Sequence, residues 1–349
     1  MTGQPPATYA AAGVDVAAGA HAVELIASRL RSADRPGVLG GIGGFAGRFS
    51  LREGAWRDPV LVAATDGVGT KLEVARAMGT YATVGTDLVA MCVDDLVCTG
   101  AEPLFFLDYV SVGQLDADIV AELVAGIDAA CLVVGCALLG GETAEHPGVM
   151  APDQVDLAGF AVGAVERDEQ LGPELVGAGD ALVALASPGL RSNGYSLARH
   201  VLLERAGRSL DDPAWPDASR SLGEVLLEPS VLYTPHVRRV LAEHPRAVHA
   251  AAHVTGGGIA ANVVRALPEG LAADLDRGAL EVPRIFDEIR SAGGVKEAEM
   301  ALAFNLGVGM ILVVDPDRAS DVVATLRAGG ITAARAGTVR EGPREVTVR

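Results

Sequence analysis

The sequence predicts an α/β protein of mixed α+β character, built from two α/β domains. Apolar runs of strand length alternate with amphipathic stretches of helix length through both halves of the chain, which favours open α/β sandwiches over a barrel. The chain has 349 residues, half of them hydrophobic, and this is enough for two cores of ordinary size. We place the domain boundary near residue 170 and expect domains over 1–170 and 171–349.

The first half is expected to form a sheet with the order β-α-β-α-β-β. A buried strand over 59–65 runs into Asp66-Gly67, and a helix over 86–99 is stopped by Gly100. The other elements expected here are a strand over 104–111, a helix over 116–133, and strands over 137–141 and 156–165.

The second half alternates in the same way. Its predicted strands cover 181–186, 247–255, 308–314 and 331–339. Its predicted helices cover 196–206, 222–243, a segment that starts at 259, and 319–328.

Composition and charge exclude several classes of protein. A formal net charge of −17 opposes binding to nucleic acid or to an anionic membrane surface. No apolar run reaches the roughly 18 residues of a membrane span, and the N-terminus does not resemble a signal peptide. The four cysteines form no CxxC pair, so a structural zinc site is not expected. We expect a cytoplasmic protein with no membrane or nucleic-acid partner.

The segment TDGVGTK, residues 65–71, is the first candidate for chemistry. Asp66 follows a strand, where ligands bind in open α/β sheets. Gly67 permits a close approach of the backbone, and Lys71 can reach a phosphate. The chain contains no Gly-Lys dipeptide, so this is not a P-loop. An Asp-Gly turn beside a solvated lysine is the alternative.

Acids of the predicted helix over 86–99 form the second candidate. Asp87 and Asp94 share one stripe of an otherwise apolar helix, and Asp95 lies about 80° round from Asp87. Ligation of Mg²⁺ would explain them, although acids that face solvent are the alternative. Glu142 follows a strand and two glycines, as Asp66 follows its strand. Acids at the ends of neighbouring strands can converge on one cation, whereas a helix-capping role is the alternative.

Glycine-rich and polar turns supply the remaining candidates. Residues 37–49 match GxGxxA but lack the βαβ context of a dinucleotide site, so we expect a loop that orders over a ligand. HVTGGG, residues 253–258, stands between a strand and a helix and favours an anion site over a plain turn. His253 itself is either a site residue or a buried partner. Further turns contain the polar residues Ser192, Asn193 and Asn305. For Ser192 and Asn193, helix capping is the alternative.

Taken together, these segments resemble the phosphoribosylformylglycinamidine cyclo-ligases, also called AIR synthetases. The resemblance runs from about residue 9 to residue 338 and is carried, in order, by YAAAGVD, GGIGGF, TDGVGTK, GTDLVAMCVDDLVCTGAEPLFFLDY, GGETAE, DLAGFAVG, SNGYSL, HVTGGG and FNLGVG. The match over 85–109 is the most specific. The wider superfamily includes thiamine monophosphate kinase, selenophosphate synthetase and a hydrogenase maturation protein.

The resemblance implies an activity and a set of residues. The family closes formylglycinamidine ribonucleotide to aminoimidazole ribonucleotide with ATP and Mg²⁺, and pairs two chains through their N-terminal sheets as a homodimer. It implies catalytic roles for Asp66, Asp95 and His253, and metal ligation by Asp66, Asp95 and Glu142. Residues implied to contact ATP are Gly43, Gly44, Phe45, Asp66, Gly67, Lys71, Asp87, Asp95 and Glu142. Residues implied to contact the substrate are Ser192, Asn193, Thr255, Gly256, Gly257, Gly258 and Asn305.

The chain departs from the family pattern at several positions. The histidine usual before SNGYS is Arg191 here, and an arginine is not a general base at neutral pH. The glycine triplet continues with Ala-Asn262-Val rather than with the usual Glu-Asn and a proline. The usual tryptophan near residue 281 is missing. These differences weaken the transfer of residue roles in the second domain.

Three other functions remain open at this point. A sibling kinase or synthetase on the same scaffold is the main alternative, although the segments 85–109 and SNGYSL speak against it. An oxidoreductase built on GGIGG would bind NADH. A non-catalytic nucleotide-binding regulator is opposed by the acids beside Lys71.

Overall fold

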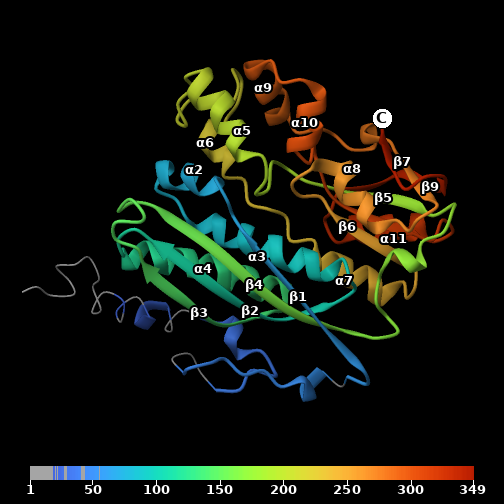
Figure 1. Cartoon of the computed structure of the whole chain (residues 1–349), viewed down its shortest axis with the longest axis horizontal. Coiled ribbons are helices and arrows are strands. Elements are labelled where there is room, and N and C mark those ends of the chain that lie inside the picture. The colour runs from blue at the N-terminus through green and yellow to red at the C-terminus, as the bar shows by residue number, and fades with distance from the viewer. Residues whose placement is uncertain (1–18, 20, 22, 27–29, 41–43, 55) are drawn as a thin grey trace, which may run out of the picture.

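The computed structural model describes residues 19, 21, 23–26, 30–40, 44–54 and 56–349. Two sheets form its framework, one of four strands from the first half of the chain and one of six from the second. Helix α3 (Ala82–Val97) lies between them, packed on the first sheet and in contact with elements of the second half (Figure 1). The prediction of two α/β units is confirmed. The boundary at residue 170 stays a prediction and falls between strands β4 and β5.

The first sheet contains all four strands expected from the sequence. They are β1 (Pro59–Gly67), β2 (Glu102–Val112), β3 (Ala137–Glu145) and β4 (Val155–Glu166), in the spatial order β1-β4-β2-β3. Strands β2 and β3 are parallel, and β4 is antiparallel to both of its neighbours. As a result, β1 and β3 form opposite edges of the sheet.

Helices α3 and α4 (Ala117–Val134) cover one face of this sheet (Figure 1). The two helices approach closely where each carries a glycine: a Cβ on Gly85 would lie 2.5 Å from the backbone nitrogen of Ile127, and one on Gly126 would lie 2.3 Å from the carbonyl oxygen of Ala82. Asp116 caps α4 by accepting hydrogen bonds from the Asp118 and Ile119 amides. A short helix that the sequence did not suggest, α2 (Lys71–Met78), precedes α3.

The two faces of the first sheet differ because side chains alternate along a strand. On β1, Val60, Val62 and Ala64 pack against the apolar core under α3 and α4. On the opposite face, which we call the outer face, Leu61 is 59% exposed and Phe160 of β4 is 44% exposed. The outer face therefore carries large apolar side chains in contact with solvent.

The second sheet has the order β10-β7-β9-β5-β8-β6. Its strands are β5 (Ala181–Ala186), β6 (Val248–His253), β7 (Leu271–Leu275), β8 (Val308–Val314), β9 (Ala333–Glu341) and β10 (Val346–Val348). Helices α7 (Thr234–Glu243) and α11 (Ala319–Ala328) contribute to the apolar cluster on one face, and α8 (Gly258–Val263) contributes to the cluster on the other. Every residue of β8 is buried, as its continuous apolar run indicates.

The structure corrects one predicted helix and adds further elements. The single helix expected over 222–243 is wrong: α6 (Leu222–Leu226) and α7 are separate, and Pro229 stands between them, where it cannot continue a helix. The helix expected over 196–206 begins as α5 (Tyr195–Arg199) and continues as a π-helix over His200–Arg205. The elements not predicted here are β7, β10, α9 (Arg284–Gly293) and α10 (Glu297–Ala303). Within the described residues, no helix is both long and apolar enough to span a membrane.

Candidate active site

The three acids of α3 have very different environments. Asp87 and Asp94 are fully buried and lie seven residues apart, so they project from the same side of the helix. Asp95 follows directly, yet its side chain is 45% exposed. The buried pair and the exposed acid therefore have separate tasks.

Asp87 is held by Lys71, the first residue of α2. The Nζ of Lys71 lies 2.6 Å from Oδ2 of Asp87 and donates to the carbonyl of Glu228 at 2.7 Å, and both side chains are fully buried. Asp87 also accepts from the amide and hydroxyl of Ser230. In this arrangement the ammonium and carboxylate are engaged with protein groups. The predicted contact of Lys71 and Asp87 with ATP stays a prediction.

Asp94 is held by Arg191 from the loop after β5. The Nη2 of Arg191 donates to Oδ2 of Asp94 at 2.9 Å, and the guanidinium stacks over the Tyr233 ring at 4.7 Å. Oδ1 of Asp94 accepts from the amides of Tyr233 and Thr234. Burial acts to lower the pKa of Arg191, but Tyr233 and Asp94 outweigh it and leave that pKa raised. The ion pair thus joins α3 to the second half of the chain.

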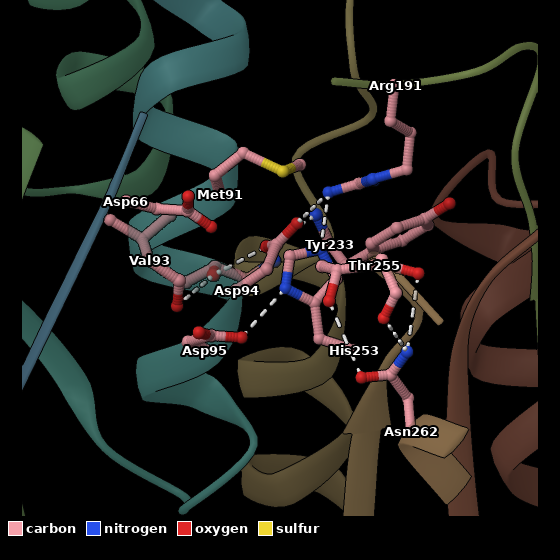
Figure 2. Close-up of polar contacts among 12 residues, drawn as sticks. Asp66, Met91, Val93, Asp94, Asp95, Arg191, Tyr233, His253, Thr255 and Asn262 are labelled. Atoms are coloured by element: carbon pink, nitrogen blue, oxygen red, sulfur yellow. Dashed lines mark hydrogen bonds and ion pairs between the residues drawn. The ribbon is translucent and has the colours of Figure 1, made fainter. Parts of the chain in front are cut away.

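His253, the last residue of β6, connects this ion pair to the exposed acid. Its Nε2 lies 2.9 Å from Nη2 of Arg191, and its Nδ1 lies 2.9 Å from Oδ1 of Asp95. Figure 2 shows the resulting path from Asp94 through Arg191 and His253 to Asp95. The His253 side chain is 1% exposed. The sequence therefore identified a residue that the structure places beside Asp95, with both ring nitrogens already engaged.

Asp66 lies near Asp95 at the end of β1. Partial burial raises the pKa of the Asp66 carboxyl, and the negative charge of Asp95 raises it further, while the hydrogen bond from the Gly67 amide opposes the change. A cation bound beside both carboxylates would offset this effect on Asp66. Mg²⁺ commonly uses one or two protein carboxylates together with substrate phosphates. The donor set Asp66 and Asp95 fits such an ion.

A cavity of about 470 Å³ opens beside these groups, between β1, the end of α3, and β6. Asp95 and His253 line it, together with Thr65, which precedes Asp66. Asn262 and Arg265 of the α8 region close the other side. The cavity therefore has the Asp95 carboxylate on one wall and the cationic Arg265 on another, which suits a polyanionic ligand that brings its own metal.

Glu142 is not placed where the sequence analysis expected it. The expectation that Asp66 and Glu142 end neighbouring strands is wrong, because two strands separate β1 from β3. The register also aligns Asp66 with Asp108 and Glu142 with Tyr109, so the two acids point to opposite faces. Among the described residues, no three His, Cys, Asp or Glu side chains cluster as a metal site. A ligand role for Glu142 stays a prediction.

The polar turns of the second half come together in part. A Cβ on Gly256 would lie 3.5 Å from Oδ1 of Asn193, so these two loops are neighbours. Gly257 and Gly258 have φ of 92° and 72°, in the left-handed region that glycine favours. Asn262 fixes the loop by donating to the carbonyls of Gly256 and Gly258. Helix α8 spans Gly258–Val263 only, so its dipole adds little to an anion site.

The other residues predicted to contact ATP or the substrate differ in their burial and in their hydrogen bonds. The hydroxyl of Ser192 is buried with no hydrogen-bond partner in the described part of the chain. Asn305 is buried, and its amide joins the Gly189 carbonyl to the Gly307 amide, which is a structural task. Phe45 is fully exposed. Gly44 is also exposed, whereas Gly43 lies outside the described residues.

Two family models and one close relative decide the classification. The N-terminal domain model of the AIR synthase related proteins matches residues 54–165, and the C-terminal domain model matches residues 177–349. The chain belongs to the AIR synthase family. The phosphoribosylformylglycinamidine cyclo-ligase of Symbiobacterium thermophilum is 50% identical over 98% of each chain. This relative confirms the resemblance drawn from the motifs. The protein is an enzyme of the ligase class that forms C–N bonds.

Solved structures place the AIR synthase chain within a broader fold group. A thiamine-monophosphate kinase from Stenotrophomonas maltophilia is 21% identical over 93% of this chain and 95% of its own, with a TM-score of 0.64. The hydrogenase maturation protein HypE in complex with ATP is 20% identical over 93% of this chain and 90% of its own, also with a TM-score of 0.64. At these identities the comparison shows the shared fold.

Sequence reasoning assigned no function to two residues that organise this site, Arg191 and Asn262. Arg191 and Asn262 were visible in the sequence only as departures from the AIR synthase pattern. The available signal was Arg191, a cationic residue in the turn LRSNG, in a chain rich in carboxylates. That signal predicts an ion pair, but it does not say which acid is the partner.

Proposed function

We propose that the chain is an ATP-dependent cyclo-ligase that converts formylglycinamidine ribonucleotide to 5-aminoimidazole ribonucleotide, with release of ADP and phosphate. The observation that carries the proposal is the Asp95 carboxylate, which lines the cavity and whose negative charge contributes to the raised pKa of Asp66 nearby. The 50% identity to a cyclo-ligase supplies the substrate.

The proposed reaction suits a site made of acids and polar loops. An amide oxygen is a poor leaving group, and transfer of the ATP γ-phosphoryl group converts it to a phosphate ester. The substrate's own amine then attacks that carbon, and phosphate leaves. Phosphoryl transfer depends mainly on positioning and charge neutralisation, and an intramolecular attack gains from orientation. No protein nucleophile is required.

The residues divide between nucleotide and substrate in this proposal. Asp66 and Asp95 would hold Mg²⁺, which neutralises phosphate charge when bound. Asn193 and the 255–258 loop, which lie beside each other, would contact the substrate. Arg265 lines the same cavity and adds a positive charge for a phosphate group.

We also propose a homodimer formed through the outer face of the first sheet. Leu61 and Phe160 are exposed there by 59% and 44%, and burial of such side chains favours association. A cytoplasmic location is proposed as well, because all four cysteines are unpaired, as is typical of a reducing compartment.

Turnover with defined substrates tests the proposed activity. Purified protein is mixed with ATP, Mg²⁺ and either formylglycinamidine ribonucleotide or thiamine monophosphate, and ADP release is measured. We expect ADP release only with the first substrate. Release only with thiamine monophosphate would instead assign the kinase activity of the structural relative.

A further inference from the structure

Both N–H groups of one terminal nitrogen of Arg191 have a partner in the buried network. Nη2 of Arg191 carries two N–H groups, and it lies 2.9 Å from Oδ2 of Asp94 and 2.9 Å from Nε2 of His253. A guanidinium is always charged in proteins and has no acceptor atom. The contact with His253 is therefore possible only if Nε2 accepts the hydrogen bond through its lone pair.

The tautomer of His253 follows from this contact. A ring nitrogen that accepts a hydrogen bond carries no proton, so the ring proton must be on Nδ1. Nδ1 lies 2.9 Å from Oδ1 of Asp95, and a carboxylate oxygen can accept that proton. Donor and acceptor are matched at each step, and the residue is 4% exposed, so water does not compete for either ring nitrogen.

We propose that Arg191 is a positioning residue that fixes His253 in the Nδ1–H tautomer and, through it, holds the Asp95 carboxylate toward the cavity. In this arrangement His253 is a hydrogen-bond donor to Asp95 and has no free nitrogen for the substrate. The family's usual histidine at position 191 can accept as well as donate a hydrogen bond, whereas Arg191 can only donate. With arginine at this position, the donor and the acceptor of each hydrogen bond from Arg191 to His253 and from His253 to Asp95 are fixed.

The backbone and the surroundings of Arg191 support this role. Its φ of 62° is in the left-handed region, which is unfavourable for a non-glycine residue and persists only where packing enforces it. Its other terminal nitrogen, Nη1, donates to the Val231 carbonyl at 2.9 Å. Oδ1 of Asp95 is occupied by His253, and within the described part of the chain no group donates to Oδ2. That oxygen is left for a ligand.

Nuclear magnetic resonance of the nucleotide-free protein tests the proposal directly. In protein labelled with ¹⁵N-histidine, long-range ¹H–¹⁵N correlations show which ring nitrogen carries the proton, and a His253→Gln variant assigns the signals. We expect a proton on Nδ1 and none on Nε2 in the unsubstituted protein. A proton on Nε2 would overturn the proposal.

A pair of matched variants then separates positioning from general stability. Arg191→Met removes the donor to Nε2, so the Nε2 resonance should shift. Lys71→Met removes the other buried cation paired with α3 and should leave the His253 signals unchanged. Equal effects of the two variants, or none for Arg191→Met, would contradict the proposed role. The inference rests on the proposed function only for what Asp95 binds, so a protein without ATP turnover can still show this tautomer.

Discussion

Asp94 and Asp95 are consecutive residues of α3, but the Asp94 side chain is fully buried in an ion pair and the Asp95 side chain is 45% exposed at the cavity. One turn of helix therefore has two roles: Asp94 pairs with Arg191 from the second half of the chain, and Asp95 faces the cavity. His253 joins the two through its ring. Because both halves supply members of this network, the cavity keeps its shape only while they are packed together.

Replacing Asp66 tests the proposed metal pair. Asp66→Asn keeps the shape of the side chain and removes its charge, so Mg²⁺-dependent ADP release should be abolished while the circular dichroism spectrum is retained. Asp58→Asn, an exposed acid that pairs with Arg167 just before the same strand, is the matched control and should keep activity. Normal turnover by Asp66→Asn would refute its role in metal binding.

Lys71 should be important for stability because its partner is fully buried. Lys71→Met leaves the Asp87 carboxylate without its cation, and the loss of one partner of a buried pair costs about 3–5 kcal/mol. We expect that decrease in the free energy of unfolding, measured by urea denaturation. The double variant Lys71→Met and Asp87→Asn should lose less, because it leaves no unpaired charge.

Lys296 provides the comparison, since it is the chain's other lysine and is exposed. Lys296→Met should change the free energy of unfolding by less than about 0.5 kcal/mol. Equal stability of Lys71→Met and Lys296→Met would show that the Lys71–Asp87 pair is not important for folding. The affinity of folded Lys71→Met for ATP then decides whether this lysine also contacts the nucleotide.

Asp108 should make stability depend on pH. Burial raises the pKa of its carboxyl from 3.8 to about 7, and within the described residues Oδ2 has no hydrogen-bond partner. Between these two values the native state retains a proton that the unfolded state has lost. The free energy of unfolding therefore falls as pH rises through this window. The full change in the free energy of unfolding is on the order of 4 kcal/mol, because each unit of pKa difference corresponds to about 1.4 kcal/mol.

Asp108→Asn removes this dependence because its amide does not ionise in the window. Urea denaturation at pH 5 and pH 8 should show that the variant gains stability relative to the unsubstituted protein at the higher pH. Asp211→Asn, at an exposed loop position, is the control. The prediction would be contradicted if the difference in the free energy of unfolding between Asp108→Asn and the unsubstituted protein were the same at pH 5 and pH 8.

The outer face of the first sheet should be a dimer interface. Leu61→Asp places a charge where Leu61 is 59% exposed, and burial of that charge without a partner is unfavourable. Sedimentation velocity should show a dimer for the unsubstituted protein and a monomer for the variant. Leu302 of α10 is 58% exposed, so Leu302→Asp is a control that should stay dimeric. A dimer in both variants would place the interface elsewhere.

The sequence by itself determined the elements of the first sheet and the family. Strands β1 to β4 were predictable because each is an apolar run bounded by glycine, proline or an acid. The motif over 85–109 is specific enough to indicate the AIR synthase family from residue order and spacing alone. Pro229 was also visible, and greater weight on it would have divided the helix expected over 222–243.

Only the tertiary structure decided which charges pair and which face the cavity. Local pattern gives the spacing of Asp87, Asp94 and Asp95 along α3, but their partners are Lys71, a residue of another helix, and Arg191 and His253 from the second half of the chain. The separation of Asp66 from Glu142 depends on strand order, which pairs β4 between β1 and β2. Contacts between residues distant in sequence are set by packing, and no local pattern records them.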